Sequence, residues 1–141
     1  MADSNGLSEF PIENIPNEHL LYLRVHWRHV EEGQLNPIAF QDKKPPDGGR
    51  AGLSTDWCRY ATPEQTQAGG RQPAENYGVV KLVVGTIRGI NGLTVEHAPI
   101  KGHLELPDNR AHTEVYGDKR DPEIRVNLLR AWRWVIEVAP P

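Results

Sequence analysis

The stretch Leu21-Tyr22-Leu23-Arg24-Val25-His26-Trp27-Arg28 alternates apolar and polar side chains without a break. Successive side chains of a β-strand point to opposite faces, so an extended segment of this kind has one apolar and one polar face. The polar face would carry Tyr22, Arg24, His26 and Arg28. The stretch therefore predicts a half-buried strand whose outer face is rich in groups that can bind a ligand.

The chain around this strand has the size and composition of one globular domain. Its 141 residues match the usual size of a domain, and a hydrophobic fraction of 38% is sufficient for a core. The 13 glycines and 12 prolines indicate that many residues lie in turns and loops. A formal net charge of −3 argues against nucleic acid or an anionic membrane as the partner.

The cysteine content and the amino-terminal residues indicate in which cellular compartment the protein is expected. Cys58 is the only cysteine, which excludes an intrachain disulfide and a thiolate-based structural zinc site. The first residues, 1–6, lack a basic start followed by an apolar run, and no apolar stretch approaches the ~20 residues that span a bilayer. We therefore expect a soluble, cytoplasmic protein without membrane association.

Turn and cap residues divide the chain into elements. Prolines and asparagines interrupt residues 1–18, which predicts an extended N-terminal arm before a single domain at 19–141. Further strands are predicted at 52–60, 79–84 and 111–116, a short helix between Thr62 and Gly69, and polar loops at 41–51 and 67–76.

Two signals in the second half complete the predicted fold. Asn91-Gly92, between residues 85–90 and 93–97, predicts an antiparallel hairpin. Asp121-Pro122-Glu123 has the cap and first-turn residues of a long helix, whose apolar stripe continues to Ile136. The prediction is an α+β domain with a mostly antiparallel twisted sheet, one long C-terminal helix and one or two short helices.

Several candidate motifs fail on their context. His26 and His29 are three residues apart, which places them on opposite faces of a strand, and we expect no metal site. Ser54 lacks the Gly-x-Ser-x-Gly elbow of a hydrolase nucleophile. Residues 85–89 lack the Gly-Lys-Ser/Thr ending of a phosphate loop. For His97 the expectation is a hydrogen-bonded, half-buried histidine.

The densest polar cluster is Asn109-Arg110-Ala111-His112-Thr113-Glu114-Val115-Tyr116. In a strand, His112, Glu114 and Tyr116 share one face. If this strand neighbours the first one, Arg24 and His26 could converge with His112 and Glu114 in a single cleft. The alternative is charge pairing on a solvated sheet face, which contributes only some tenths of a kcal/mol per pair.

Three anchors in this order resemble small ADP-ribosyltransferases: an Arg on an early strand (Arg24), a Ser-Thr strand edge (Ser54-Thr55) and a Glu on a late strand (Glu114). The resemblance implies NAD binding, with Arg24 at the phosphates or ribose, Ser54 on the nicotinamide side and Glu114 as the catalytic carboxylate. The chain departs from the family pattern at Asp56, where a second Ser is usual. It departs again at His112, where Glu or Gln commonly stands.

Two functions follow. The first is a module that binds a protein partner or a small-molecule ligand through the polar sheet face and the loops 41–51 and 67–76. Its predicted ligand-binding residues are Tyr22, His26, Asn109, Arg110, His112 and Tyr116. The second is an NAD-consuming enzyme that uses Glu114, Arg24 and Ser54 as its catalytic residues.

Overall fold

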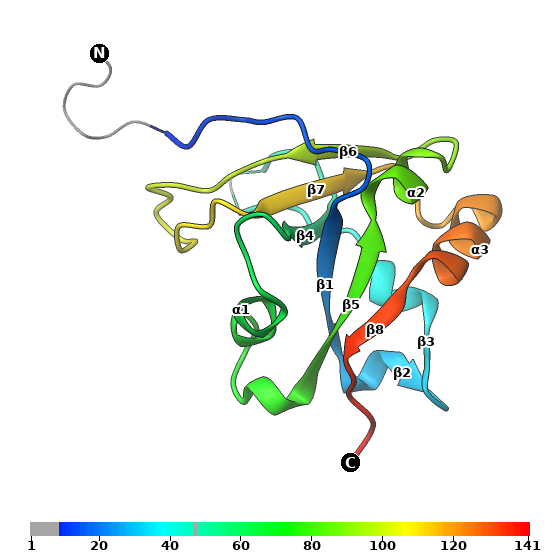
Figure 1. Ribbon diagram of the computed structural model, residues 1–141. Helices are drawn as coiled ribbons and strands as arrows, with labels where there is room; N and C mark the ends of the chain where they lie inside the picture. Colours follow the sequence, from blue (N-terminus) through cyan, green and yellow to red (C-terminus); the bar gives the residue numbers. More distant parts are fainter. Residues whose placement is uncertain (1–8, 47) are drawn as a thin grey trace.

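The computed structural model describes residues 9–46 and 48–141, and it confirms an α+β fold built on an antiparallel sheet (Figure 1). Within this part of the chain, six strands pair in the order β6-β7-β4-β1-β5-β8, and every neighbouring pair is antiparallel. A separate ribbon pairs β2 with β3. The strands are β1 (Leu20–His26), β2 (Val30–Glu31), β3 (Gln34–Leu35), β4 (Leu53–Trp57), β5 (Tyr77–Val83), β6 (Thr94–His97), β7 (His112–Tyr116) and β8 (Arg133–Ile136).

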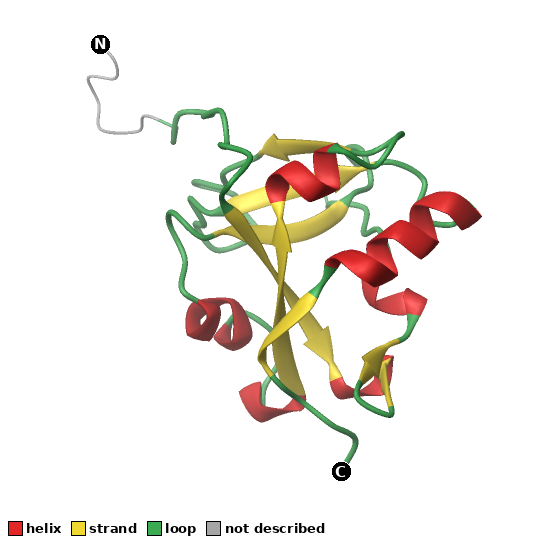
Figure 2. Ribbon diagram, turned by 45° about the vertical axis from the view of Figure 1, so that its right-hand side comes forward, coloured by secondary structure: helices red, strands yellow, loops and turns green. Residues whose placement is uncertain are grey.

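The sheet divides into two halves because β1 and β4 stay paired over only a short distance. Their register ends at Tyr22↔Asp56, whereas β1 pairs with β5 along its whole length. Beyond this pair, β4 stays with β7 and β1 stays with β5. Figures 1 and 2 show the two halves crossing each other, with β1 and β5 steep and β6 and β7 running across the top. We call the opening between residues 23–26 of β1 and 53–55 of β4 the fork.

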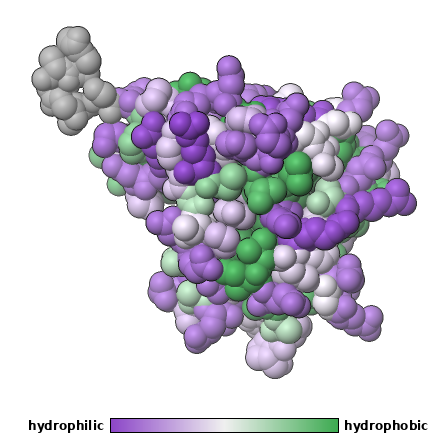
Figure 3. All heavy atoms as spheres, viewed as in Figure 1, coloured by the Kyte–Doolittle hydropathy of each residue, from purple (hydrophilic) through white to green (hydrophobic). Residues whose placement is uncertain are grey.

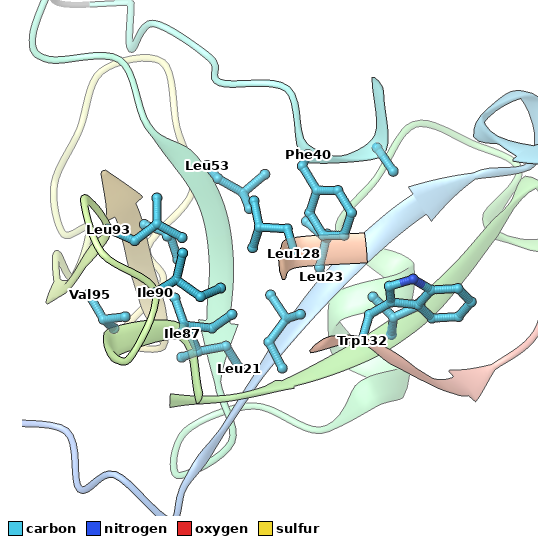
Figure 4. Close-up of a cluster of buried hydrophobic side chains, with 14 of the residues drawn as sticks. Leu21, Leu23, Phe40, Leu53, Ile87, Ile90, Leu93, Val95, Leu128 and Trp132 are labelled. Carbon is cyan, nitrogen blue, oxygen red and sulfur yellow. The ribbon is translucent and has the colours of Figure 1, made fainter. Parts of the chain in front are cut away.

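The apolar side chains of β1 face a core on one side of the sheet. Leu21, Leu23 and Val25 are each at most 4% exposed. Figure 4 shows side chains from β1, β4, β6 and the helices gathering around this core. Phe40, from the 3-10 segment Pro37–Phe40, belongs to the same cluster as Leu23 and Leu53, so apolar side chains fill the fork from the inner side. The polar side chains of β1 are therefore left on the opposite, outer face.

The short helix predicted after Thr62 is present as α1 (Pro63–Ala68). The Thr62 hydroxyl accepts from the Gln65 amide at 3.1 Å, and the Gln65 side chain accepts from the Thr62 amide at 2.9 Å. This reciprocal capping box satisfies amides that the first turn leaves unpaired. Figure 1 shows α1 on the left of the sheet, with α2 (Val84–Arg88) and α3 (Pro122–Ala131) on the right.

The hairpin predicted around Asn91-Gly92 is wrong. The residues before it form α2, and only β6 follows as a strand, paired with β7. The glycine does adopt a positive φ of 96°, but its turn joins a helix to a strand. Val84 and Ile87 are both fully buried. Their spacing of three residues places both on one face of a helical turn, whereas a strand would separate them.

The longest helix, α3, begins with the expected Asp121 cap but ends at Ala131, before the end of the predicted apolar stripe. The next residues form β8, which pairs with β5 at the edge of the sheet. The spacing of apolar residues in so short a segment is compatible with a helix or with a strand. Here the backbone edge of β5, which would otherwise be unpaired, favours the strand. Within the described part of the chain, α3 and the other helices are too short or too polar to cross a membrane.

Residues 9–18 form an extended segment that leads into β1. Ile15 is buried in the core at 3% exposure, and Arg88 donates a hydrogen bond to its carbonyl oxygen. Residues 1–8 of the predicted arm, and Asp47 of the predicted loop 41–51, lie outside the described residues.

Candidate functional site

A cleft of about 1050 Å³ opens at the fork on the polar side of the sheet. Outward-facing side chains of β1, β4 and β7 line it, together with residues of α1 and of the segments 41–46 and 106–110. β1 and β7 are not neighbours, because β4 lies between them. Their polar residues nevertheless line one cleft, because all three strands turn that face outward.

The structure brings most of the predicted site residues to this cleft. β1 contributes Tyr22, Arg24 and His26, β4 contributes Ser54, β7 contributes His112 and Glu114, and the preceding loop contributes Asn109 and Arg110. Tyr116 does not line the cleft. Its ring lies beneath the Arg50 guanidinium at 4.1 Å and beside Gly52.

Ser54, His112 and Glu114 form the most closely connected cluster of the cleft. The Ser54 hydroxyl donates to Glu114 Oε2 at 3.1 Å, and His112 Nε2 lies 2.9 Å from the same oxygen. His112 Nδ1 lies 2.8 Å from the Ala98 carbonyl oxygen, which can only accept, so Nδ1 carries a proton. This arrangement differs from a hydrolase triad, because serine and carboxylate meet the same ring nitrogen.

The surroundings of His112 favour its charged form. Burial opposes the charge, but the hydrogen bonds to Glu114 and to the Ala98 carbonyl outweigh it and raise the pKa of His112 above its ordinary value. The carboxylate of Asp56 acts in the same direction. A protonated His112 donates to Glu114 through Nε2, so the two side chains form an ion pair whose charges compensate each other.

Asp56 has a structural role at the closed end of the fork. Its Oδ2 accepts from the Thr66 hydroxyl of α1 at 2.8 Å, and its Oδ1 accepts from the Asn109 side-chain amide at 2.8 Å. One carboxylate therefore ties β4 to both walls of the cleft. A third acidic residue of the lining, Asp108, pairs with Lys101 at 3.6 Å.

The other side of the cleft is cationic. Arg24, Lys43, Lys44 and Arg71 line it, and none of them forms an ion pair with an acidic residue in the described parts of the chain. Arg24 donates to the Thr66 carbonyl at 3.0 Å and lies over the Tyr77 ring at 5.7 Å. Desolvation lowers the pKa of Lys43, and the charges of Arg24 and Arg71 lower it further.

At the rim of the cleft, the N-terminal segment 9–18 supplies an acidic partner for Arg110. Arg110 Nη2 lies 3.6 Å from Glu13 Oε2, and the same oxygen accepts a hydrogen bond from the Tyr60 hydroxyl. The bond from Tyr60, with Arg59 and Arg110, holds the pKa of Glu13 below its usual range. His97 is buried beside this cluster, and both of its ring nitrogens are bonded, to the Glu13 amide and the Arg110 carbonyl.

Lys43, Arg71 and Asp56 line the cleft but were not among the individual site residues predicted from the sequence. Asp56 could have been found, because the alternation in Leu53–Trp57 puts it on the same face as Ser54. Lys43 and Arg71 lie in the loops 41–51 and 67–76, which were expected to contribute to binding, but these loops have no periodicity that singles out individual residues. Among residues 9–46 and 48–141, no group of three or more His, Cys, Asp or Glu side chains is arranged to hold a metal ion.

Protein-family models, curated proteins and solved structures, when compared with this chain, contain no significant match to it. The residues and geometry of the cleft are therefore the basis on which we assign a function.

Proposed function

We propose that the protein is a binding module for a small, polar ligand that enters the fork cleft. The observation that carries this proposal is the cleft itself, in which side chains from three strands, one helix and two loops converge on about 1050 Å³. A concave site of this size, with a few polar groups of defined position on a rigid scaffold, is typical of small-molecule recognition. The sheet supplies the scaffold, and the segments 41–46 and 69–71 supply part of the wall.

The composition of the cleft favours a small molecule over a protein partner. Protein interfaces usually have an apolar core with aromatic anchors. On the face shown in Figure 3, hydrophobic residues occur as small groups between hydrophilic ones. The cleft combines cations, paired carboxylates and hydroxyl groups with apolar side chains such as Ile38 and Leu106, a mixture typical of small-molecule sites.

The proposal is tested by mapping backbone amide shifts by NMR while a set of small compounds, some neutral and some charged, is added one at a time. A binding compound should shift amides of β1, β4, β7 and α1. Ser54→Tyr places a ring on the exposed floor of the cleft and should abolish those shifts. Val126→Tyr adds the same ring to the exposed face of α3 and serves as the matched control.

Shifts that persist unchanged in Ser54→Tyr would place the binding site elsewhere and overturn the proposal. A set in which no compound shifts the cleft amides would also count against it. The Val126→Tyr control should retain the wild-type response.

We infer NAD cleavage as a second candidate, because Arg24, Ser54 and Glu114 line one cleft. In this reaction the bond between ribose and nicotinamide breaks, nicotinamide leaves with the bonding electrons, and water or another nucleophile adds to the ribose carbon. The Glu114 carboxylate, oriented by the Ser54 hydroxyl at 3.1 Å, would stabilise the positive charge that develops on the sugar.

This candidate is tested by measuring nicotinamide release from NAD. Glu114→Gln should reduce the rate by about a hundredfold or more with the amide spectrum unchanged. Glu96→Gln is the matched control, because Glu96 is exposed and pairs across the strands with Glu114 without lining the cleft. If the wild type releases no nicotinamide above the buffer rate, the enzymatic candidate fails and the binding proposal stands.

A further inference from the structure

The charges that line the fork cleft do not balance. Each of its acidic residues has a polar partner: His112 pairs with Glu114, Lys101 with Asp108, and Asp56 accepts from Thr66 and Asn109. Arg110 at the rim is paired with Glu13. Arg24, Lys43, Lys44 and Arg71 have no acidic partner among the described residues, so the cleft has a surplus of positive charge.

Three of these cations, Arg24, Lys43 and Arg71, come from separate elements, and Lys43 is close enough to be affected by the charges of both arginines. Arg24 projects from β1 and is held in position by the Thr66 carbonyl. A side chain at Gly70 would approach Arg24 Cδ to 2.7 Å, so the backbone just before Arg71 lies directly against Arg24. Lys43 belongs to a segment that pairs with Gly52, through two backbone hydrogen bonds of 2.9 and 3.1 Å.

We propose that Arg24, Lys43 and Arg71 bind a phosphate group of the ligand, as a phosphate monoester or a pyrophosphate. This inference rests on the proposed function and specifies the chemical class of its ligand. A carboxylate has a single charge and is satisfied by one bidentate arginine. Three cations that converge from different directions match a group with two or more negative charges and several terminal oxygens.

The electrostatics of the neighbouring groups support the proposal. Lys43 lies close enough to Arg24 and Arg71 for their charges to lower its pKa, in addition to desolvation. Desolvation likewise lowers the pKa of His29, and the charges of His26 and Lys43 lower it further. A bound phosphate would neutralise this positive field.

The test is titration calorimetry with pyrophosphate, inorganic phosphate and acetate at constant ionic strength, because screening by salt weakens such contacts. The wild type should bind pyrophosphate saturably and acetate at least tenfold more weakly. The Lys43→Gln/Arg71→Gln variant should bind pyrophosphate at least tenfold more weakly than the wild type. Both side chains are exposed and neither forms an ion pair with a described residue, so the fold should be retained.

Arg125→Gln/Arg130→Gln is the matched control, because it removes the same charge from exposed positions of α3. It should bind pyrophosphate within about twofold of the wild type, since distant charges are screened. Equal losses in both double variants would mean that net charge, and not this site, determines binding. Acetate binding as tight as pyrophosphate, or no saturable binding of either phosphate, would also overturn the proposal.

Failure of the phosphate inference can be distinguished from failure of the proposed binding function. If phosphates do not bind but a neutral compound still shifts the cleft amides, only the phosphate inference falls. If no compound of any charge shifts those amides, the proposed function falls with it.

Discussion

Tyr22 and Asp56 are the last residues at which β1 and β4 remain paired, and the candidate site begins where that pairing ends. Beyond them the sheet separates into two halves that keep their other partners, β5 and β7. Phe40 and its neighbours fill the inner side of the opening, whereas polar side chains line its outer side. The cleft is therefore a consequence of the sheet topology.

The ion pair of His112 with Glu114 gives the first prediction. Because the hydrogen bond to Glu114 raises the pKa of His112 against the effect of burial, Glu114→Gln should lower that pKa. An NMR titration of the His112 ring measures it directly. Glu96→Gln removes a charge from the adjacent strand and should change the pKa of His112 less than Glu114→Gln does. An unchanged His112 pKa in Glu114→Gln would contradict the described geometry.

The same pair makes stability depend on pH. Since the folded protein raises the pKa of His112, protonation stabilises the fold. This contribution is fully present below about pH 6.5, the ordinary value in the unfolded chain, and it is lost as the pH rises through the folded-state pKa. Urea unfolding should therefore give a difference between wild type and His112→Asn that shrinks as the pH increases. A difference that grows with pH would be the opposite of the expected sign.

The capping box of α1 should contribute measurably to stability. Thr62→Ala removes the hydroxyl that accepts from the Gln65 amide, and we expect a loss of about 1 kcal/mol in the free energy of unfolding. Thr62→Ser keeps an acceptor and is the control, with a much smaller expected loss. The two losses are compared through the denaturant midpoints of the variants, provided that their m-values are equal. Equal effects of alanine and serine would show that the hydroxyl is not the stabilising group.

Gly117 is expected to tolerate no side chain. Its φ is 136°, and a Cβ there would collide with the backbone carbonyl of Gly92. Gly102 also has a positive φ, 67°, but has open space around it. Gly117→Ala should therefore lower thermal stability clearly more than Gly102→Ala, whose cost is only the backbone strain of about 1 kcal/mol. Similar melting temperatures for the two variants would contradict this explanation.

Local patterns in the sequence predicted the elements whose period or cap is distinctive. The alternation of residues 21–28 identified β1 and its polar face as far as His26, and Thr62 with Gln65 identified α1. The strand prediction is wrong for Trp27 and Arg28, which lie in the 3-10 helix Trp27–His29. The same alternation at 112–116 placed His112 and Glu114 on one face. These predictions succeeded because side-chain direction in a strand and amide capping in a helix are determined locally.

The errors occurred where distant contacts determine the structure. Residues 133–136 continue a helical apolar spacing, yet they form β8 because β5 offers an unpaired edge. The insertion of β4 between β1 and β7 is a property of the topology that no short pattern contains. Lys43 and Arg71 enter the cleft from loops, whose position depends on the elements that they connect.

The most direct test of the central claim, that the fork cleft binds a phosphorylated small molecule, is a crystal structure of the protein grown with pyrophosphate. The prediction is electron density for the anion between Arg24, Lys43 and Arg71, within hydrogen-bond distance, about 2.7–3.2 Å, of at least two of these side chains. An empty cleft at saturating pyrophosphate, or an anion bound only at another surface, would contradict it.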